Sequence, residues 1–229
     1  DAIFAHQILA NRLVTRSPAP LSAYRLAVVK TLMLDNLDPL VAQAFQRSLD
    51  VLRRAGAHID EIDLDRLMEL GPMQATGGFS AAESYAWHRR LIEQHAGAYD
   101  PRVLARIARG ADMLASDYVE LMQSRQSWIG RMEQAMQGYD AVLSPTVPIV
   151  APPIADVAPG ADRDATFFRV NALLLRNTAA VNMLDGCALS LPCQRGDEAA
   201  VGLMVWHAAM HDDAVLNVAR EIERTLPKQ

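Results

Sequence analysis

The first part of the chain changes between strand-like and helix-like patterns of apolar residues. Tyr24–Lys30 is a short, partly β-branched apolar run, which predicts a buried strand. Asp38 and Pro39 then form the N-cap and first turn of a helix that ends at Gly56. Ala57–Leu64 alternates apolar and acidic residues, as a strand with one solvated face does. A strand, a helix and a strand within about 40 residues form a βαβ unit, so the two strands are expected to be parallel neighbours.

The middle of the chain, residues 64–137, is predicted to be helical. Gly71-Pro72 and Gly77-Gly78 interrupt the helical pattern. We interpret this segment, at about residues 65–137, as a helical insert in one domain that comprises residues 1–229. Its expected helices are Ser80–His95, Pro101–Arg109 and Ser116–Gln137.

The last third returns to a mixture of strands and helices. Tyr139–Ile154 is a strand that enters a proline-rich, extended loop. Two apolar strands, joined by a polar turn, are expected near the end of the chain. The whole pattern predicts a soluble α/β domain. The remaining elements are a helix at Thr166–Met183, strands at Cys187–Cys193 and Val201–His207, and a last helix that Asp212 caps.

Composition narrows the class of protein. Half of the residues are hydrophobic (51%) and 21% are charged, as in globular proteins. The net charge of -5 provides no basic face for phosphates, so no nucleic-acid partner is expected. No apolar run reaches the roughly 18 residues of a membrane span, and no signal peptide is visible. The chain starts at Asp1 in the middle of a helical pattern, so we expect that its true start is missing or was removed.

Candidate chemical groups in the chain do not form a known catalytic motif. Ser144 lies at a strand end, but Pro145 follows it and the G-x-S-x-G nucleophile elbow is absent. His207 and His211 have no Glu between them, so they are not a zinc-binding H-E-x-x-H motif. We expect no metal and no cofactor. Cys187 and Cys193 are interpreted as buried free thiols of a reduced compartment, which favours a cytoplasmic protein.

Read from end to end, the chain resembles the C-terminal half of amidase-signature enzymes. The resemblance rests on segments that occur in the order of the family and cover nearly the whole chain. These segments are DAIFAHQILA, LAVVK with LDPLVAQAFQRSLDVLRRAGAHIDEIDL, ESYAWHRRLIEQHAGAYDPRVLARIARG, YDAVLSPTVPIVAPPI, RNTAAVNMLDGCALSLPC, and VGLMVWHAAMHDDAVLNVAREIE.

The resemblance implies a fold and an activity. The expected fold is the C-terminal part of an α/β domain, with a mixed sheet covered by helices on both faces. The implied reaction is hydrolysis of a carboxylic amide to an acid and ammonia or an amine, through a Ser nucleophile, a second Ser and a Lys. In the family these three residues precede the segment that matches Asp1. Lys30 and Lys228 match no catalytic position, so no catalytic residue is assigned and this chain alone is expected to be inactive.

The resemblance also implies part of a substrate pocket. Ser144, Pro145 and Thr146 resemble the edge of the acyl pocket of the family. Arg106 resembles an arginine that grips the substrate in the glutaminyl-tRNA amidotransferase subunit, although it also fits an ordinary helix-surface arginine. That subunit usually has an acidic residue where this chain has Leu175, which argues against glutamine and for a more apolar acyl group.

Two other interpretations remain open from the sequence. The chain is a non-catalytic, truncated or degenerate remnant in the first, and part of an amidotransferase A-type subunit in the second. In every case a sheet cut from its upstream strands would expose apolar surface. We therefore expect self-association or pairing with the N-terminal half, and a small-molecule amide as the substrate of the full-length protein.

Overall fold

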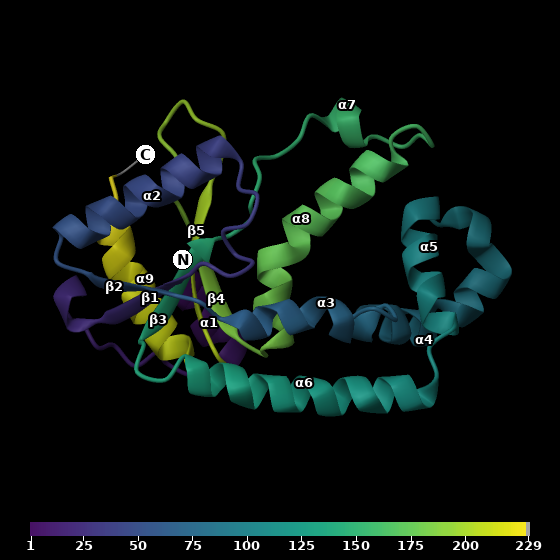
Figure 1. The fold of residues 1–229 in the computed structure, drawn as a ribbon, viewed down its shortest axis with the longest axis horizontal. Coiled ribbons are helices and arrows are strands. Elements are labelled where there is room, and N and C mark those ends of the chain that lie inside the picture. Colours follow the sequence, from purple (N-terminus) through teal and green to yellow (C-terminus); the bar gives the residue numbers. More distant parts are fainter. Residues whose placement is uncertain (228–229) are drawn as a thin grey trace. The chain divides into compact units, whose positions relative to one another are not determined.

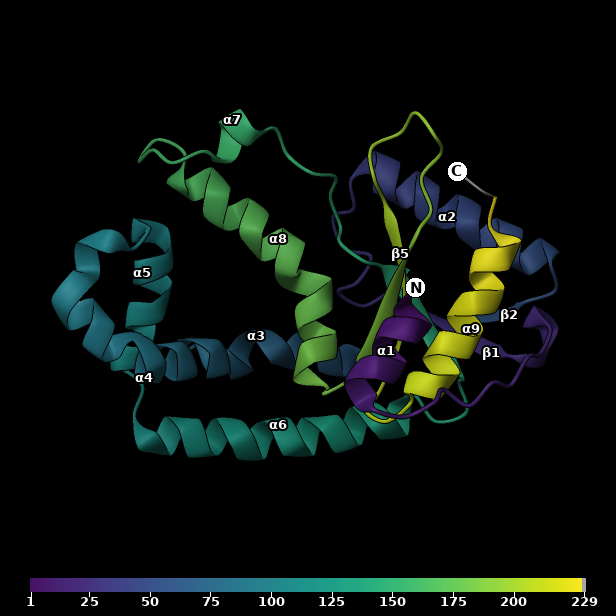
Figure 2. The same cartoon turned by 180° about the vertical axis from the view of Figure 1, so that it is seen from behind.

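The computed structural model describes residues 1–227, so Lys228 lies outside the described residues. The chain forms two compact units, which we describe separately. The first unit contains residues 1–65 and the chain from Met132 onward, and the second contains Arg66–Arg131. Figures 1 and 2 show the ribbon from opposite sides. The strands of the described residues all belong to the first unit.

The first unit is built on a mixed five-stranded sheet with the order β2-β1-β3-β5-β4. β2, β1 and β3 run parallel, whereas β5 is antiparallel to both of its neighbours. Leu26 of β1 lies opposite Ile59 of β2, which confirms the predicted βαβ unit. The mixed sheet with its helices also confirms the α/β class. The strands are β1 (Arg25–Val29), β2 (His58–Ile62), β3 (Ala141–Pro145), β4 (Cys187–Pro192) and β5 (Gly202–His207).

One face of the sheet packs against two amphipathic helices, α2 (Pro39–Arg54) and α9 (Asp212–Thr225). Alternate strand residues point to this face, because successive side chains of a strand alternate between faces. Each fully buried Leu, Val, Ile or Phe here stabilises the fold by about 1.5–3 kcal/mol relative to an exposed side chain. The core of this face includes Leu26, Val28, Phe45, Leu49, Leu52, Leu143, Leu203, Val205, Val218 and Ile222.

The N-terminal cap of α2 agrees with the prediction from the sequence, whereas that of α9 differs from it. Asp38 caps α2 as predicted, because its carboxylate accepts a hydrogen bond from the backbone N–H of Leu40 at 2.8 Å. The prediction that Asp212 caps α9 is wrong. His211 is the N-cap residue and its side chain makes no cap hydrogen bond. Asp212 is instead the first helical residue, where its negative charge suits the helix dipole.

Helix α8 (Asp164–Met183) lies on the side of the sheet opposite to α2 and α9 (Figures 1 and 2). Its last two turns bury Asn177, Ala180 and Val181, whereas its first turns are more exposed. The single-turn helix α7 (Ile154–Val157) precedes it within the proline-rich stretch and was not predicted.

The first helix, α1 (Ala2–Ala10), has no buried residue. The chain after it is tied to α9, because Asp213 accepts hydrogen bonds from Arg12 Nη2 at 3.2 Å and from the Thr15 N–H at 3.1 Å. Asn217 adds a bond to the Thr15 carbonyl at 2.8 Å. Three large apolar side chains of α1 are exposed, namely Phe4 (70%), Ile8 (62%) and Leu9 (87%).

The second unit is helical throughout, apart from its turns. Gly110 permits close packing in it, because a Cβ atom there would overlap the backbone of Ala81. Trp128 is fully buried and its indole N–H donates to the Arg66 carbonyl at 2.7 Å. Within residues 1–227, no helix combines the length and apolarity needed to cross a membrane. The helices of this unit are α3 (Leu70–Met73), α4 (Gly78–His95), α5 (Pro101–Ala108) and most of α6 (Ala115–Ala135).

Candidate functional site

The candidate site lies where the parallel strands β1 and β3 end. Ligands of open α/β sheets bind outside the carboxyl ends of such strands, because the connecting loops meet there. The loop after β1 reaches Asp38, whose N–H donates to the Pro148 carbonyl in the loop after β3 at 2.8 Å. These two loops are thus joined by a backbone hydrogen bond, and they frame the end of β3.

Three of the predicted pocket residues lie together at the end of β3. Ser144 and Pro145 are its last two residues and both are buried. Thr146 follows and is half-buried, and its N–H donates to the Gly202 carbonyl of β5 at 2.8 Å. This bond continues the ladder one residue beyond the strand, so the position of Thr146 is fixed by the sheet.

Ser144 has no group that could activate it. Its side chain is 0% exposed, and its Oγ has no hydrogen-bond partner among the described residues. A serine nucleophile needs an adjacent base or a lowered pKa. On the same face of the sheet, the Nε1 of Trp206 is also buried without a partner. The buried Ser144 hydroxyl is therefore not placed as an activated nucleophile.

A polar clamp, formed by Arg176 and Asn177 of α8, holds the two loops. The fully buried Asn177 amide donates to the carbonyls of Pro145 at 2.8 Å and Met33 at 3.2 Å. Arg176 donates to the Asn177 side-chain oxygen at 3.0 Å and to the Asp35 carbonyl at 2.7 Å. Burial lowers the pKa of the Arg176 guanidinium, which nevertheless stays charged at neutral pH.

Sequence reasoning missed this clamp, because residues 166–183 were interpreted only as a helix. The one signal was an Arg-Asn pair that directly follows the apolar stretch ALLL in RVNALLLRNTAAVNM. Buried polar groups in such a run need partners, and here the partners are backbone carbonyls of distant loops.

Two hydroxyl groups meet beside the clamp. The Oγ1 of Thr146, the residue after β3, and the Oγ of Ser190 on the edge strand β4 lie 2.6 Å apart. Gly202 of β5 lies between them, and a Cβ atom at Gly202 would overlap both hydroxyls. Ser190 is exposed. The pair can offer one O–H donor and free lone pairs to a ligand, because each hydroxyl carries one proton and two acceptor sites.

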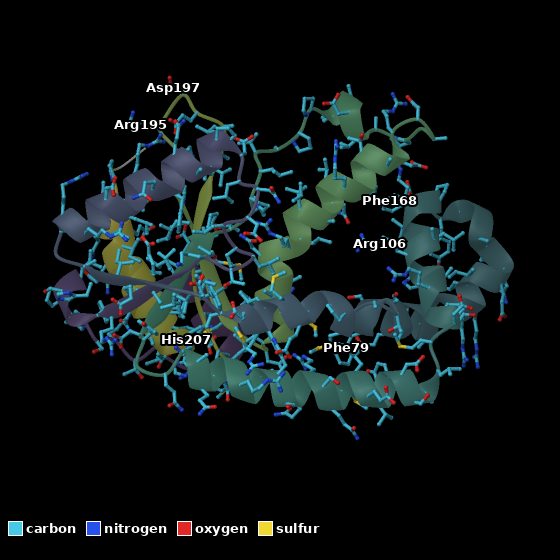
Figure 3. All side chains as sticks on the ribbon, viewed as in Figure 1. Phe79, Arg106, Phe168, Arg195, Asp197 and His207 are labelled. Carbon is cyan, nitrogen blue, oxygen red and sulfur yellow. The ribbon has the colours of Figure 1, made fainter. Side chains whose placement is uncertain are left out.

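Arg106 belongs to the second unit, so it is described there. It is exposed on α5 and lines a hollow of about 280 Å³ together with Ser80, Ser84 and Arg109. Arg109 is engaged through its donation to the Ala75 carbonyl at 2.9 Å. Figure 3 labels Arg106 on its helix. A guanidinium beside two serines can hold a carboxylate or a carbonyl oxygen.

The histidines form contacts that differ from those of a metal site. His207 is buried, and its ring contacts that of the exposed His211 with 3.9 Å between centroids. His88 is hydrogen-bonded to the Tyr99 hydroxyl at 2.8 Å. In the part of the chain that the structure describes, no group of three or more His, Cys, Asp or Glu residues is placed to hold a metal ion.

Comparisons with known proteins give the same family as the motifs. A family model described as Amidase matches residues 10–216. The chain is 25% identical over 210 residues to 2-amino-5-chloromuconic acid deaminase of Comamonas testosteroni, which covers 90% of this chain and 45% of that protein. It is also 25% identical over 227 residues to the A subunit of the glutamyl-tRNA(Gln) amidotransferase of Salinispora arenicola, which covers 89% of this chain and 45% of that protein.

Solved structures resemble the fold over nearly all of the chain. A crystal structure of an amidase superposes with a TM-score of 0.79 at 23% identity, over 99% of this chain and 51% of that one. The 6-aminohexanoate cyclic dimer hydrolase superposes with a TM-score of 0.76 at 19% identity, over 94% of this chain and 47% of that one. The chain therefore spans about half the length of the relatives that it matches.

Proposed function

The chain belongs to the amidase family, and we propose that it is the C-terminal portion of an amidase whose nucleophilic Ser lies in the N-terminal half. The observation that carries the proposal is the match of residues 10–216 to the family, combined with 45% coverage of the first relatives. The chain has no adjacent Ser-Ser pair, and neither of its lysines matches a catalytic position. The nucleophile, the bridging Ser and the Lys are therefore assigned to residues upstream of Asp1.

In the proposed reaction the upstream Ser attacks the carbonyl carbon of a carboxylic amide. Its proton passes to the Lys through the second Ser, and the C–N bond breaks to release ammonia or an amine. Water then hydrolyses the acyl-enzyme and releases the acid and the Ser. Backbone N–H groups stabilise the oxyanion in both steps. This sequence of steps uses no metal ion or cofactor.

The contribution of this chain is proposed to be the wall of the acyl pocket. Ser144, Pro145 and Thr146 end β3 at the carboxyl edge of the parallel strands, and Asn177 fixes the Pro145 carbonyl. The exposed Thr146–Ser190 hydroxyl pair offers a hydrogen-bonding point there. Within the second unit, Arg106 is proposed as a substrate-binding residue, because it lines the hollow on α5.

The acyl group is proposed to be apolar. Leu175 lies on α8 and is 44% exposed, and Phe168, two turns before it on the same helix, is 39% exposed. Two half-exposed apolar side chains spaced by seven residues form an apolar stripe on a helix. An acidic residue in place of Leu175 would suit the amino group of glutamine, so the Leu favours an amidase over an amidotransferase subunit.

Pairing with the N-terminal half is proposed to cover the open edge of β4 and the apolar side chains of α1. The edge strand β4 has a partner only on the β5 side among the described strands. Between α1, β4 and α9 lies a hollow of about 490 Å³. Open edges and exposed apolar helices are association sites, so the chain alone is expected to self-associate.

The test compares the full-length protein with the isolated chain of residues 1–229. A serine-reactive fluorophosphonate should label the full-length protein at a serine upstream of Asp1, and should label no residue of the isolated chain. The full-length protein should also release ammonia or amine from simple aliphatic or aryl amides. Labelling of native Ser144 would contradict the assignment of the nucleophile to the upstream half, whereas a full-length protein without turnover on any amide would support the non-catalytic interpretation.

A further inference from the structure

A hollow of about 450 Å³ lies in the first unit, and Ser144, Pro145 and Thr146 are not among its lining residues. Its walls come from α2, from the loop after β4 and from the residues that follow α9. Figure 1 shows α2, the C-terminal end of α9 and the loop between β4 and β5 on one side of this unit, and Figure 3 labels Arg195 on that loop. This volume is within the range of small-molecule sites.

The floor of the hollow is apolar and uncharged. Val51 of α2 and Leu226 after α9 line it, together with Pro192 at the end of β4. Cys193 also lines it, and burial raises the pKa of this thiol to about 11, so the sulfur is neutral at physiological pH. A floor of this kind favours a carbon skeleton over a hydrated ion.

The rim of the hollow carries three guanidinium groups, those of Arg47, Arg54 and Arg195. Arg47 is compensated by an ion pair with Glu198. Arg54 and Arg195 are exposed, and in residues 1–227 neither guanidinium makes an ion pair or a hydrogen bond. The Arg54 and Arg195 guanidinium groups, which come from different elements, can therefore donate hydrogen bonds to a ligand at the edge of this apolar hollow.

The acidic groups near the rim are already engaged. Asp50 lines the hollow, and its carboxylate accepts from Gln46 Nε2 at 2.9 Å and lies 4.0 Å from Arg53. Glu198 accepts from the Arg195 N–H at 2.9 Å in addition to its ion pair with Arg47. The Arg195 N–H and, by a smaller amount, the charge of Arg195 lower the pKa of Glu198, but no residue among 1–227 accepts a hydrogen bond from the Arg54 or Arg195 guanidinium.

We propose that this hollow binds a small organic carboxylate with an apolar body, held by Arg54 and Arg195. A guanidinium presents two parallel N–H donors that match the two oxygens of a carboxylate. The body of the ligand would rest on the floor formed by Val51, Cys193 and Leu226. This site is separate from the proposed acyl pocket and does not depend on the amidase proposal.

The test is isothermal titration calorimetry on the full-length protein, with benzoate, benzyl alcohol and inorganic phosphate as probes. Benzoate should bind, whereas benzyl alcohol lacks the charge and phosphate lacks the apolar body, so both should bind at least tenfold more weakly. Arg54→Ala and Arg195→Ala should each weaken benzoate binding about five- to tenfold, because each removes a charge-assisted bond at a partly exposed site. Arg89→Ala, at an exposed position on α4 that lines none of these hollows, should leave the affinity unchanged.

Three results would overturn the proposal. The first is no benzoate binding, and the second is benzoate affinity that Arg54→Ala and Arg195→Ala leave unchanged. The third is equal binding of benzoate and phosphate, which would mean that the apolar floor plays no part. Thermal unfolding of each variant shows that it is folded. Arg54→Lys keeps the charge but loses the two parallel N–H donors of the guanidinium. Its affinity for benzoate should lie between those of the wild type and Arg54→Ala.

Discussion

The imidazole ring of His211 lies against that of His207, with 3.9 Å between the ring centroids and an angle of 32° between the planes. His207 is only 5% exposed and ends β5, whereas His211 is the N-cap residue of α9. The His207 Nε2 is 3.2 Å from the Tyr139 carbonyl, and its Nδ1 is buried without a partner. This contact therefore joins the end of the sheet to the start of the last helix.

The first prediction is that acid destabilises the fold through His207. Burial, together with the neighbouring His211, lowers the pKa of His207, whereas the Tyr139 carbonyl and Asp140 raise it by less. Below the unfolded pKa of about 6.5 the unfolded chain binds more protons, so the free energy of unfolding falls as the pH falls towards the folded pKa. The slope from one such group is at most about 1.4 kcal/mol per pH unit.

Urea unfolding of the full-length protein between pH 5 and 8 measures this slope. His207→Phe keeps a flat ring but cannot titrate, so its stability should depend less on pH below 6.5 than that of the wild type. His95→Gln, at an exposed position on α4, should retain the wild-type slope. Identical slopes for His207→Phe and the wild type would show that His207 does not carry the effect.

The second prediction concerns the close approach at Gly202. A methyl group there would overlap both the Thr146 and the Ser190 hydroxyls, so Gly202→Ala should separate the pair and destabilise the protein by about 1–3 kcal/mol. Gly196 lies in the loop between β4 and β5, and no atom lies within 4 Å of the position that its Cβ would take. Chemical denaturation should therefore show less than about 0.5 kcal/mol for Gly196→Ala. A Gly202→Ala variant as stable as the wild type would contradict the observed packing.

The third prediction concerns the clamp on α8. Asn177→Ala leaves the carbonyls of Met33 and Pro145 without their side-chain donor in a buried setting, which should cost about 1–3 kcal/mol in the free energy of unfolding. Thr178→Ala removes only a hydroxyl that bonds within its own helix, to the Leu175 carbonyl, and should cost less than about 0.5 kcal/mol. Denaturant titration distinguishes the two, and equal losses would argue against a special role of Asn177.

The fourth prediction concerns the thiols, which the structure shows to be half-buried and not fully buried as the sequence suggested. Burial is the main cause that raises the pKa of Cys187 and of Cys193 to about 11. At pH 8 roughly one thiol in a thousand is then ionised, and the thiolate is the reactive form. Labelling with a thiol reagent should be slow in the native protein and fast in denaturant. Rapid native labelling of either cysteine would contradict this.

The fifth prediction tests the proposed apolar acyl group. In the full-length protein, Leu175→Asp should lower kcat/KM for an aliphatic amide about 10- to 100-fold, because an apolar acyl group would remove water from the carboxylate without replacing its hydrogen bonds. Leu91→Asp is a matched change at a similarly exposed position on α4 and should leave kcat/KM unchanged. If Leu175→Asp is as active as the wild type, the acyl group does not contact Leu175.

The sequence by itself determined the local elements and their class. Asp38, Pro39 and the apolar stripe that follows predicted α2, because capping and helical periodicity act within a few residues. The alternation at Ala57–Leu64 predicted the parallel partner of β1 for the same reason. The cap of α9 was assigned to Asp212 instead of His211, because a boundary shifted by one residue leaves the periodic pattern almost unchanged.

Only the tertiary structure decided the groups that touch one another at the candidate site. Asn177 bonds to carbonyls 144 and 32 residues away along the chain, and Thr146 meets Ser190 across Gly202. His207 and His211 are four residues apart, yet their ring contact depends on the turn between β5 and α9. Periodicity reports which face of an element is buried. The partner of a buried polar side chain is set by how distant elements pack, and no local pattern encodes that distance.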